Sequence, residues 1–295
     1  MSVEPDTYRP TPPAKTFFGP PVDADKWGRL KLGIFWIIVV GIGLLIVSSV
    51  MSNPRFQWPV VGRYLLDPTV LSGFITTLWL TVVIMIIGVV LGIALALMSL
   101  STSQPLRAFS TAYLWFFRGT PVLVQLIFWY NLAALYPTYS IGIPLTDIVL
   151  AQGSFNDLIT PYTAALLGLG LNEAAYMAEI VRAGLESVPR GQRDATAALG
   201  LNRWQTMRLV VLPQAMRFIV PPTGNQTIGM LKGTSIVSIV ALSDLLYSVQ
   251  TIYSRTFQTI PLLLVACFWY LVATTVLSLL QRYIEQHYSR GYAAR

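Results

Sequence analysis

The sequence predicts an all-α integral membrane protein with six transmembrane helices. Hydrophobic residues make up 54% of its 295 residues and charged residues 11%, whereas about 25% of residues are charged in ordinary globular domains. The apolar residues gather in six stretches, and all but the third reach the roughly 20 residues that cross a bilayer. The stretches are residues 33–52, 71–100, 120–135, 162–183, 218–242 and 261–280.

Individual stretches carry further signals. The second is longer than a bilayer requires, so we expect it to tilt or to extend past the lipid. Pro221 and Pro222 lie near the start of the fifth and predict a bent or broken beginning of that helix. Gly88 and Gly92 form a G-x-x-x-G pattern in the second, which permits close helix packing.

Lysine and arginine residues orient the chain. Sixteen of the twenty lie before the first stretch, in the second connection, in the fourth connection with Arg182 at the end of the stretch before it, or after the last stretch. Three lie on the opposite side, and Lys232 falls within a stretch. Cytoplasmic loops carry the excess of positive charge, so we expect a multi-pass protein of the cell membrane with both termini in the cytoplasm. The same distribution accounts for the net charge of +7 without nucleic acid as a partner.

Composition divides the chain into four parts. Residues 1–30 are polar and contain several prolines, so we expect a mobile cytoplasmic tail. Residues 31–69 hold the first transmembrane helix and an external connection, residues 70–283 the core, and residues 284–295 a second cytoplasmic tail. The polar lead before residue 33 and the absence of an A-x-A-like site argue against a cleaved signal peptide. With Cys267 and His287 as the only cysteine and histidine, we expect no disulfide framework and no metal site.

The segment 187–213 is polar and basic, yet it lies between two apolar stretches. It predicts two short helices joined by a turn at the membrane surface, which is typical of a docking site for a soluble partner. The boundary signals are Ser187 and Pro189 for the first start, Gly200 for its stop, Asn202 with Gln205 for the second start, and Pro213 for the next boundary. A DNA-reading helix-turn-helix needs a free recognition helix, whereas here the second helix is tethered to a membrane stretch.

This segment resembles the coupling loop of type I ABC importer permeases, whose pattern is E-A-A, three residues, G, nine residues, I, any residue, L-P. Here Asp194-Ala195-Thr196 precedes Gly200 by three residues, and Val210 and then Leu212-Pro213 follow at the same spacing. Asp replaces Glu, Thr replaces Ala and Val replaces Ile. Asp194 has a shorter reach than Glu toward a basic group on a partner.

Four further fragments follow in the order of the polar-amino-acid branch of that family, the histidine, glutamine and glutamate permeases. The resemblance covers residues 70–283 and implies a five-helix core, to which residues 33–52 add one helix. The fragments are Thr76-Thr77-Leu78-Trp79-Leu80-Thr81, the F-R-G-T-P run at residues 117–121, the A-Y-x-A-E-I-x-R run at residues 175–182, and L-K-G-T-S at residues 231–235, where the branch has L-K-D-T-S.

The resemblance implies a permease subunit that carries a polar amino acid and is not itself an enzyme. No G-x-x-x-x-G-K-[ST] phosphate loop occurs in the sequence, so ATP and Mg²⁺ are expected on a partner ATPase. The implied partners are two ABC ATPase subunits, a second permease chain of the same or another kind, an extracytoplasmic amino-acid-binding protein and the lipid bilayer. The residues expected to contact the ATPase are Arg193, Asp194, Ala195, Thr196, Gly200, Leu201 and Arg203.

Polar residues within apolar stretches predict a substrate path. Lys232 has two interpretations, a contact for a substrate carboxylate or half of an internal ion pair with a glutamate; Glu179 either lines the path or pairs with Arg182. The full set is Asn225, Gln226, Gly229, Lys232, Thr234, Ser235, Glu173, Tyr176 and Glu179. The alternative function is a membrane receptor or enzyme with a basic cytoplasmic hairpin, although one histidine and one cysteine offer few catalytic groups.

Overall fold

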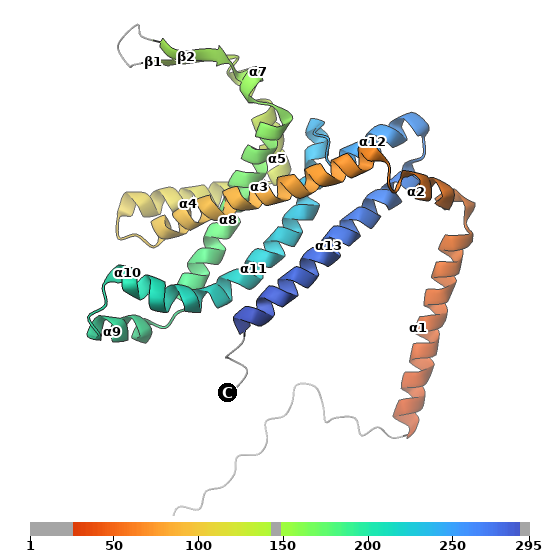
Figure 1. Ribbon diagram of the computed structural model, residues 1–295, viewed down its shortest axis with the longest axis horizontal. Coiled ribbons are helices and arrows are strands. Elements are labelled where there is room, and N and C mark those ends of the chain that lie inside the picture. Colours follow the sequence, from red (N-terminus) through yellow and green to blue (C-terminus); the bar gives the residue numbers. More distant parts are fainter. Residues whose placement is uncertain (1–25, 143–148, 290–295) are drawn as a thin grey trace, which may run out of the picture. The chain divides into compact units, whose positions relative to one another are not determined.

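The computed structural model describes residues 26–142 and 149–289 (Figure 1). The chain forms two compact units, Met1–Phe56 and Gln57–Arg295. The first contains helix α1 (Lys26–Ser52) and a 3-10 turn at Pro54–Phe56. Helix α1 begins within the segment expected to be a mobile tail; the rest of that tail, up to residue 25, lies outside the described residues.

The second unit begins earlier than the core expected at residue 70. Helix α2 (Trp58–Tyr64) packs on α13 (Thr259–Ser289), and the Trp269 indole donates a hydrogen bond of 2.9 Å to the Leu65 carbonyl. The remaining elements are α3 (Pro68–Ser99), α4 (Gln104–Gly119), α5 (Val122–Tyr130), α6 (Leu132–Leu135), β1 (Thr138–Gly142), β2 (Val149–Ser154), α7 (Phe155–Leu158), α8 (Pro161–Glu186), α9 (Arg190–Ala198), α10 (Arg203–Thr206), α11 (Leu212–Gly233) and α12 (Leu245–Thr256).

Among the described residues, four helices are long and apolar enough to cross a membrane, at Lys31–Ser52, Pro68–Ser99, Pro161–Glu186 and Thr259–Gln286. The pair Arg203–Val240 and Leu245–Thr256, bent by 46°, makes a fifth span when it is counted as one. The third apolar stretch instead forms α5 and α6, and the nine residues of α5 rise only about 14 Å against the ~30 Å hydrocarbon core. The count of six spans therefore stays a prediction.

The bend in the fifth span does not lie at the prolines. Pro221 and Pro222 lie inside α11, and the helical path continues from Arg203 to Val240, ending in a 3-10 turn at Thr234–Val240. The direction changes after it, where Ala241 adopts a left-handed conformation with φ of 57°. The Asp244 carboxylate then accepts a 2.8 Å hydrogen bond from the Tyr247 amide and caps α12.

Helices α3 and α8 form the most extensive helix pair of the described chain (Figure 1). Gly88 lies against Glu173, and Gly92 lies against Met177 and the Ala178 amide. A Cβ at Gly92 would come within 2.6 Å of the Met177 Cβ and 2.9 Å of the Ala178 nitrogen. The two glycines therefore let the backbones meet, which confirms close packing by the G-x-x-x-G pattern.

The first half of α3 packs against α12. The Thr77 hydroxyl is fully buried and accepts a 3.0 Å hydrogen bond from the Leu245 amide. A Cβ at Gly73 would lie 2.6 Å from the Asp244 carbonyl oxygen. Helix α3 thus fixes α8 along one half and the bent fifth span along the other.

Helices α4 and α5 are separated by a break at Thr120 and Pro121. The break frees the carbonyls of Phe117 and Thr120, and buried amides replace the lost helical donors. The Gln125 side chain donates to both carbonyls, at 3.1 and 3.2 Å, and the Asn172 amide donates to the Phe117 carbonyl at 2.7 Å. The F-R-G-T-P run therefore forms a helix break that is hydrogen-bonded to α8.

Strands β1 and β2 form an antiparallel hairpin that the all-α expectation did not include. Thr138 pairs with Ser154 and Ile141 with Ala151, and the register shifts between Ile141 and Gly142. Figure 1 shows the hairpin beyond the ends of α5 and α8, joined to α8 through α7. The rest of the second unit that the structure describes is helical.

Replacing Gly92 with alanine is expected to lower stability, because the added methyl meets backbone atoms that cannot rotate away. Overpacking of this kind costs about 1–3 kcal/mol, so the thermal unfolding temperature of the detergent-solubilised protein should fall. Gly62→Ala is the matched control, since nothing lies within 4 Å of its added Cβ. Equal unfolding temperatures for Gly92→Ala and the unchanged protein would contradict the close contact.

Candidate functional site

The segment between α8 and α11 forms the expected helical hairpin. Pro189 precedes α9, and Gly200 ends it with φ of +75°, a left-handed conformation that glycine adopts without strain. Asn202 and Gln205 form a reciprocal capping box at the start of α10. The two helix starts and the stop at Gly200 are thereby confirmed, except that Ser187 caps the end of α8 rather than the start of α9.

Two residues expected to contact a partner make polar contacts within the chain, and of these Arg193 is also exposed. Thr196 is 4% exposed, and its hydroxyl accepts a 3.0 Å hydrogen bond from the Thr206 hydroxyl. The Arg193 guanidinium donates at 2.8 Å to the Leu185 carbonyl at the end of α8. Thr196 therefore joins α9 to α10, and Arg193 joins α9 to α8, so the hairpin is held by its own polar contacts.

The outward face of the hairpin carries two large apolar side chains that the sequence reasoning missed. Leu199 is 78% exposed and Trp204 is 69% exposed. Asp194, Ala195 and Arg203 are exposed as well. The available signal was the presence of Leu199, Leu201 and Trp204 among the polar and small residues of 190–206, because large apolar side chains exposed on a surface indicate an interaction site.

The hairpin continues directly into α11. Helix α10 passes through a π-helical turn at Met207–Val211 into Leu212, so that Arg203–Val240 is a single helical path. From Trp204 to Lys232 this path is about 42 Å long at 1.5 Å per residue. Trp204 and the polar residues of α11 therefore lie on one helical path.

Glu173 and Gln226 join α8 to α11. Both carboxylate oxygens of Glu173 accept from the Gln226 amide, each at 3.2 Å. Glu173 is 2% exposed, and no lysine or arginine of the described chain forms an ion pair with it. Gln226 therefore leaves the stripe expected on α11 and turns toward α8.

Asn225, Gly229 and Lys232 share the exposed face of α11. The Asn225 side chain accepts a 3.1 Å hydrogen bond from Gln281 on α13. Nothing lies within 4 Å of a Cβ built on Gly229. The stripe expected on α11 is therefore present without Gln226.

Lys232 lines a cavity of about 440 Å³ between α11 and α13, together with Ser235, Cys267, Tyr270, Leu271 and Thr274. Its ammonium forms no ion pair with any carboxylate of the described residues. The interpretation of Lys232 as half of an internal ion pair with a glutamate therefore gains no support from this conformation. Thr234, by contrast, is fully buried and donates to the Leu231 carbonyl.

Glu179 belongs to a separate charged cluster on the α4 side of α8. Its carboxylate pairs with Arg182 at 2.6 Å and with Arg118 at 3.5 Å, while Arg182 also pairs with Glu186 at 2.8 Å. The Arg118 guanidinium lies 5.7 Å from the centre of the Tyr176 ring. Pairing of Glu179 with Arg182 is confirmed, and the structure separates Glu179 and Tyr176 from the residues of α11.

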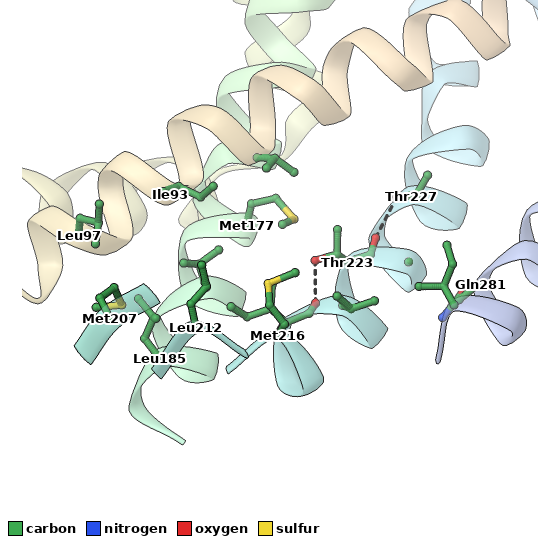
Figure 2. Close-up of a pocket in the computed structure, with 16 residues that line it drawn as sticks. Ile93, Leu97, Met177, Leu185, Met207, Leu212, Met216, Thr223, Thr227 and Gln281 are labelled. Atoms are coloured by element: carbon green, nitrogen blue, oxygen red, sulfur yellow. Dashed lines mark hydrogen bonds between the residues drawn. The ribbon is translucent and has the colours of Figure 1, made fainter. Parts of the chain in front are cut away.

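A larger cavity of about 550 Å³ lies between α3, α8, α11 and α13. Figure 2 shows Leu97, Met177 and Met216 on its walls and Thr223, Thr227 and Gln281 at one end. None of the residues expected for the substrate path lines it. Within the described chain, no group of three or more histidine, cysteine, aspartate or glutamate side chains could hold a metal ion.

These features match a known family. Residues 88–290 fit the family described as "Binding-protein-dependent transport system inner membrane component". The chain belongs to this family. The hairpin that the structure builds at α9 and α10, between two apolar helices, lies within the matched region, so the transporter interpretation is confirmed and the receptor or enzyme alternative is not favoured.

Relatives in this family include amino-acid permeases. The arginine transport system permease protein ArgU of Corynebacterium glutamicum is 42% identical over 95% of this chain and 87% of its own length. The glutamate/aspartate import permease protein GltK of Escherichia coli O6:H1 is 34% identical over 79% of this chain and 98% of its own. A crystal structure of an amino acid ABC transporter with histidines superposes with a TM-score of 0.63 at 35% identity, covering 75% of this chain and 94% of that one.

Membership of the family settles, in general form, the expected location, the expected kinds of partner and the expectation that the chain is not an enzyme. The chain is an inner-membrane, multi-pass permease component. Such components work with a separate ATPase and a binding protein and are not enzymes themselves.

Proposed function

We propose that this permease component imports a polar amino acid, with arginine as the first candidate. The observation that carries the proposal is the exposed ammonium of Lys232, which lines a cavity without a carboxylate partner in the described chain. Every free amino acid carries an α-carboxylate that such an ammonium attracts. Identity of 42% to an arginine permease over nearly the whole chain supports a cationic side chain in the substrate.

The substrate passes along the exposed face of α11 that carries Asn225, Gly229 and Lys232. Ser235 lies in the same cavity as Lys232. Glu173 is buried behind this face, and the half-buried Gln226 is hydrogen-bonded to it. In the present conformation these two side chains position α11 against α8. A shift of α11 that opened this contact would present the Glu173 carboxylate to the cationic side chain of the substrate.

The hairpin of α9 and α10 receives the motion of the ATPase. Leu199 and Trp204 form its apolar contact, and Asp194, Ala195, Gly200, Leu201 and Arg203 surround them. ATP and Mg²⁺ are bound by two ATPase subunits, and a second permease chain completes the path. Because α10 continues into α11, a pull on Trp204 moves the residues around Lys232, which couples ATP hydrolysis to alternating access.

Both termini lie in the cytoplasm in this proposal, and the β-hairpin faces the extracytoplasmic binding protein. A cysteine replacing Gln152, which is exposed in β2, should react with a membrane-impermeant thiol reagent in intact cells. A cysteine replacing Thr11 should react only after permeabilisation. Cys267 is an exposed free thiol and must first be changed to serine. The opposite labelling pattern would contradict the proposed orientation.

Trp204→Ala and Leu199→Ala are expected to release the ATPase, because each removes a large apolar side chain from the proposed interface. Truncation of a central apolar anchor typically costs about 2 kcal/mol or more, so the amount of ATPase that co-purifies should fall roughly tenfold or more. Leu66→Ala is the control, since Leu66 is similarly exposed but lies outside the hairpin. Unchanged co-purification with both hairpin variants would disprove the docking surface.

Lys232→Met should abolish most uptake in proteoliposomes that contain the complete importer and its binding protein. Loss of a charged hydrogen bond costs about 1.5–3 kcal/mol, so uptake of labelled arginine should fall about ten- to hundredfold. Assembly with the ATPase should persist, because removing the Lys232 ammonium takes no ion-pair partner from any described carboxylate.

The control is Lys31→Met, which removes an exposed lysine from α1. Excess unlabelled lysine or histidine should compete with arginine, and glutamate should not. Full uptake by Lys232→Met would refute the role of Lys232, and competition by glutamate alone would refute the cationic substrate.

A further inference from the structure

The face of α4 that meets α8 forms a basic pocket of about 620 Å³ outside the proposed substrate path. Arg107, Thr111, Trp115 and Arg118 recur along α4 at the spacing of one helical face, and Arg182 of α8 closes the other side. Ser99 at the end of α3 also lines the pocket. Three arginines from two helices therefore line one concave surface.

The positive charge of this pocket is only partly neutralised. Glu179 is its one acidic lining residue, and it is shared between Arg182 at 2.6 Å and Arg118 at 3.5 Å. Glu186 adds a second partner for Arg182 alone. Arg107 forms no ion pair with any residue that the structure describes. Arg107 is therefore the arginine of this pocket whose charge no described carboxylate neutralises.

The pocket continues into a second hollow of about 620 Å³ that shares Arg107, Thr111 and Trp115 and reaches Gln104 at the start of α4. Trp115 is 76% exposed, and the neighbouring large apolar side chains Leu106, Phe109 and Phe116 are also exposed on α4. Basic groups therefore lie directly beside uncovered apolar surface, which suits a ligand with an anionic head and an apolar tail.

We propose that this groove binds an anionic phospholipid, with Arg107 donating to its phosphate and an acyl chain lying along Trp115. Basic pockets between membrane helices on the cytoplasmic side suit anionic headgroups, and the proposed orientation places this end of α4 there. Arginine presents a planar fork of donors that matches a phosphate. The apolar surroundings select a lipid over free phosphate, because inorganic phosphate gains nothing from Trp115 or Phe116.

The test measures binding of spin-labelled phosphatidylglycerol and phosphatidylcholine to the purified, assembled importer in detergent. The unchanged protein should prefer phosphatidylglycerol. Arg107→Gln should lower that preference about fivefold, since an arginine near anionic lipid contributes about 1 kcal/mol. Arg107→Lys should retain most of it. Arg217→Gln, which removes an exposed arginine of α11 outside both hollows, should leave it unchanged.

Three outcomes would overturn the proposal. One is equal binding of the two lipids by the unchanged protein, and another is an equal loss in Arg107→Gln and Arg217→Gln. The third is displacement of phosphatidylglycerol by millimolar inorganic phosphate, which would identify a site for the free anion. Substrate uptake is not the readout, so failure of this proposal is distinguishable from failure of the transport proposal.

Discussion

The close contact of α3 with α8 at Gly88 and Gly92 is the constraint on which the rest of the core depends. Because no side chain separates the backbones there, α8 is held at a fixed distance from α3 along its middle. The other half of α3 holds α12 through Thr77. One long helix therefore sets the positions of both α8 and the bent fifth span, between which the polar residues lie.

Helix α8 distributes its polar groups to three partners. Asn172 supplies an amide to the break between α4 and α5, Glu173 accepts from Gln226 of α11, and Glu179 pairs with arginines on the α4 side. A buried polar group without a partner costs free energy, and each of these has one. The contacts link α8 to α4, α5 and α11.

The hairpin of α9 and α10 combines a rigid attachment with an uncovered face. Arg193 and Thr196 use their polar atoms inside the chain, whereas Leu199 and Trp204 leave apolar surface outside. A loop that was merely flexible could not transmit force. Internal hydrogen bonds and the helical continuity of Arg203–Val240 stiffen the hairpin, as the proposed coupling role requires.

The sequence by itself determined the membrane class, the family, the helical hairpin with its stop at Gly200, and the close packing at Gly88 and Gly92. These follow from local chemistry: apolar stretches of membrane length, capping residues, and glycines at helical spacing. Only the tertiary structure decided that Thr196 is buried, that Gln226 turns to Glu173, and that Lys232 has no carboxylate partner among the described residues. It also decided that residues 120–135 form short helices and that Arg107 lies with Arg118 and Arg182, because the partner of a side chain on another helix is set by how the helices pack.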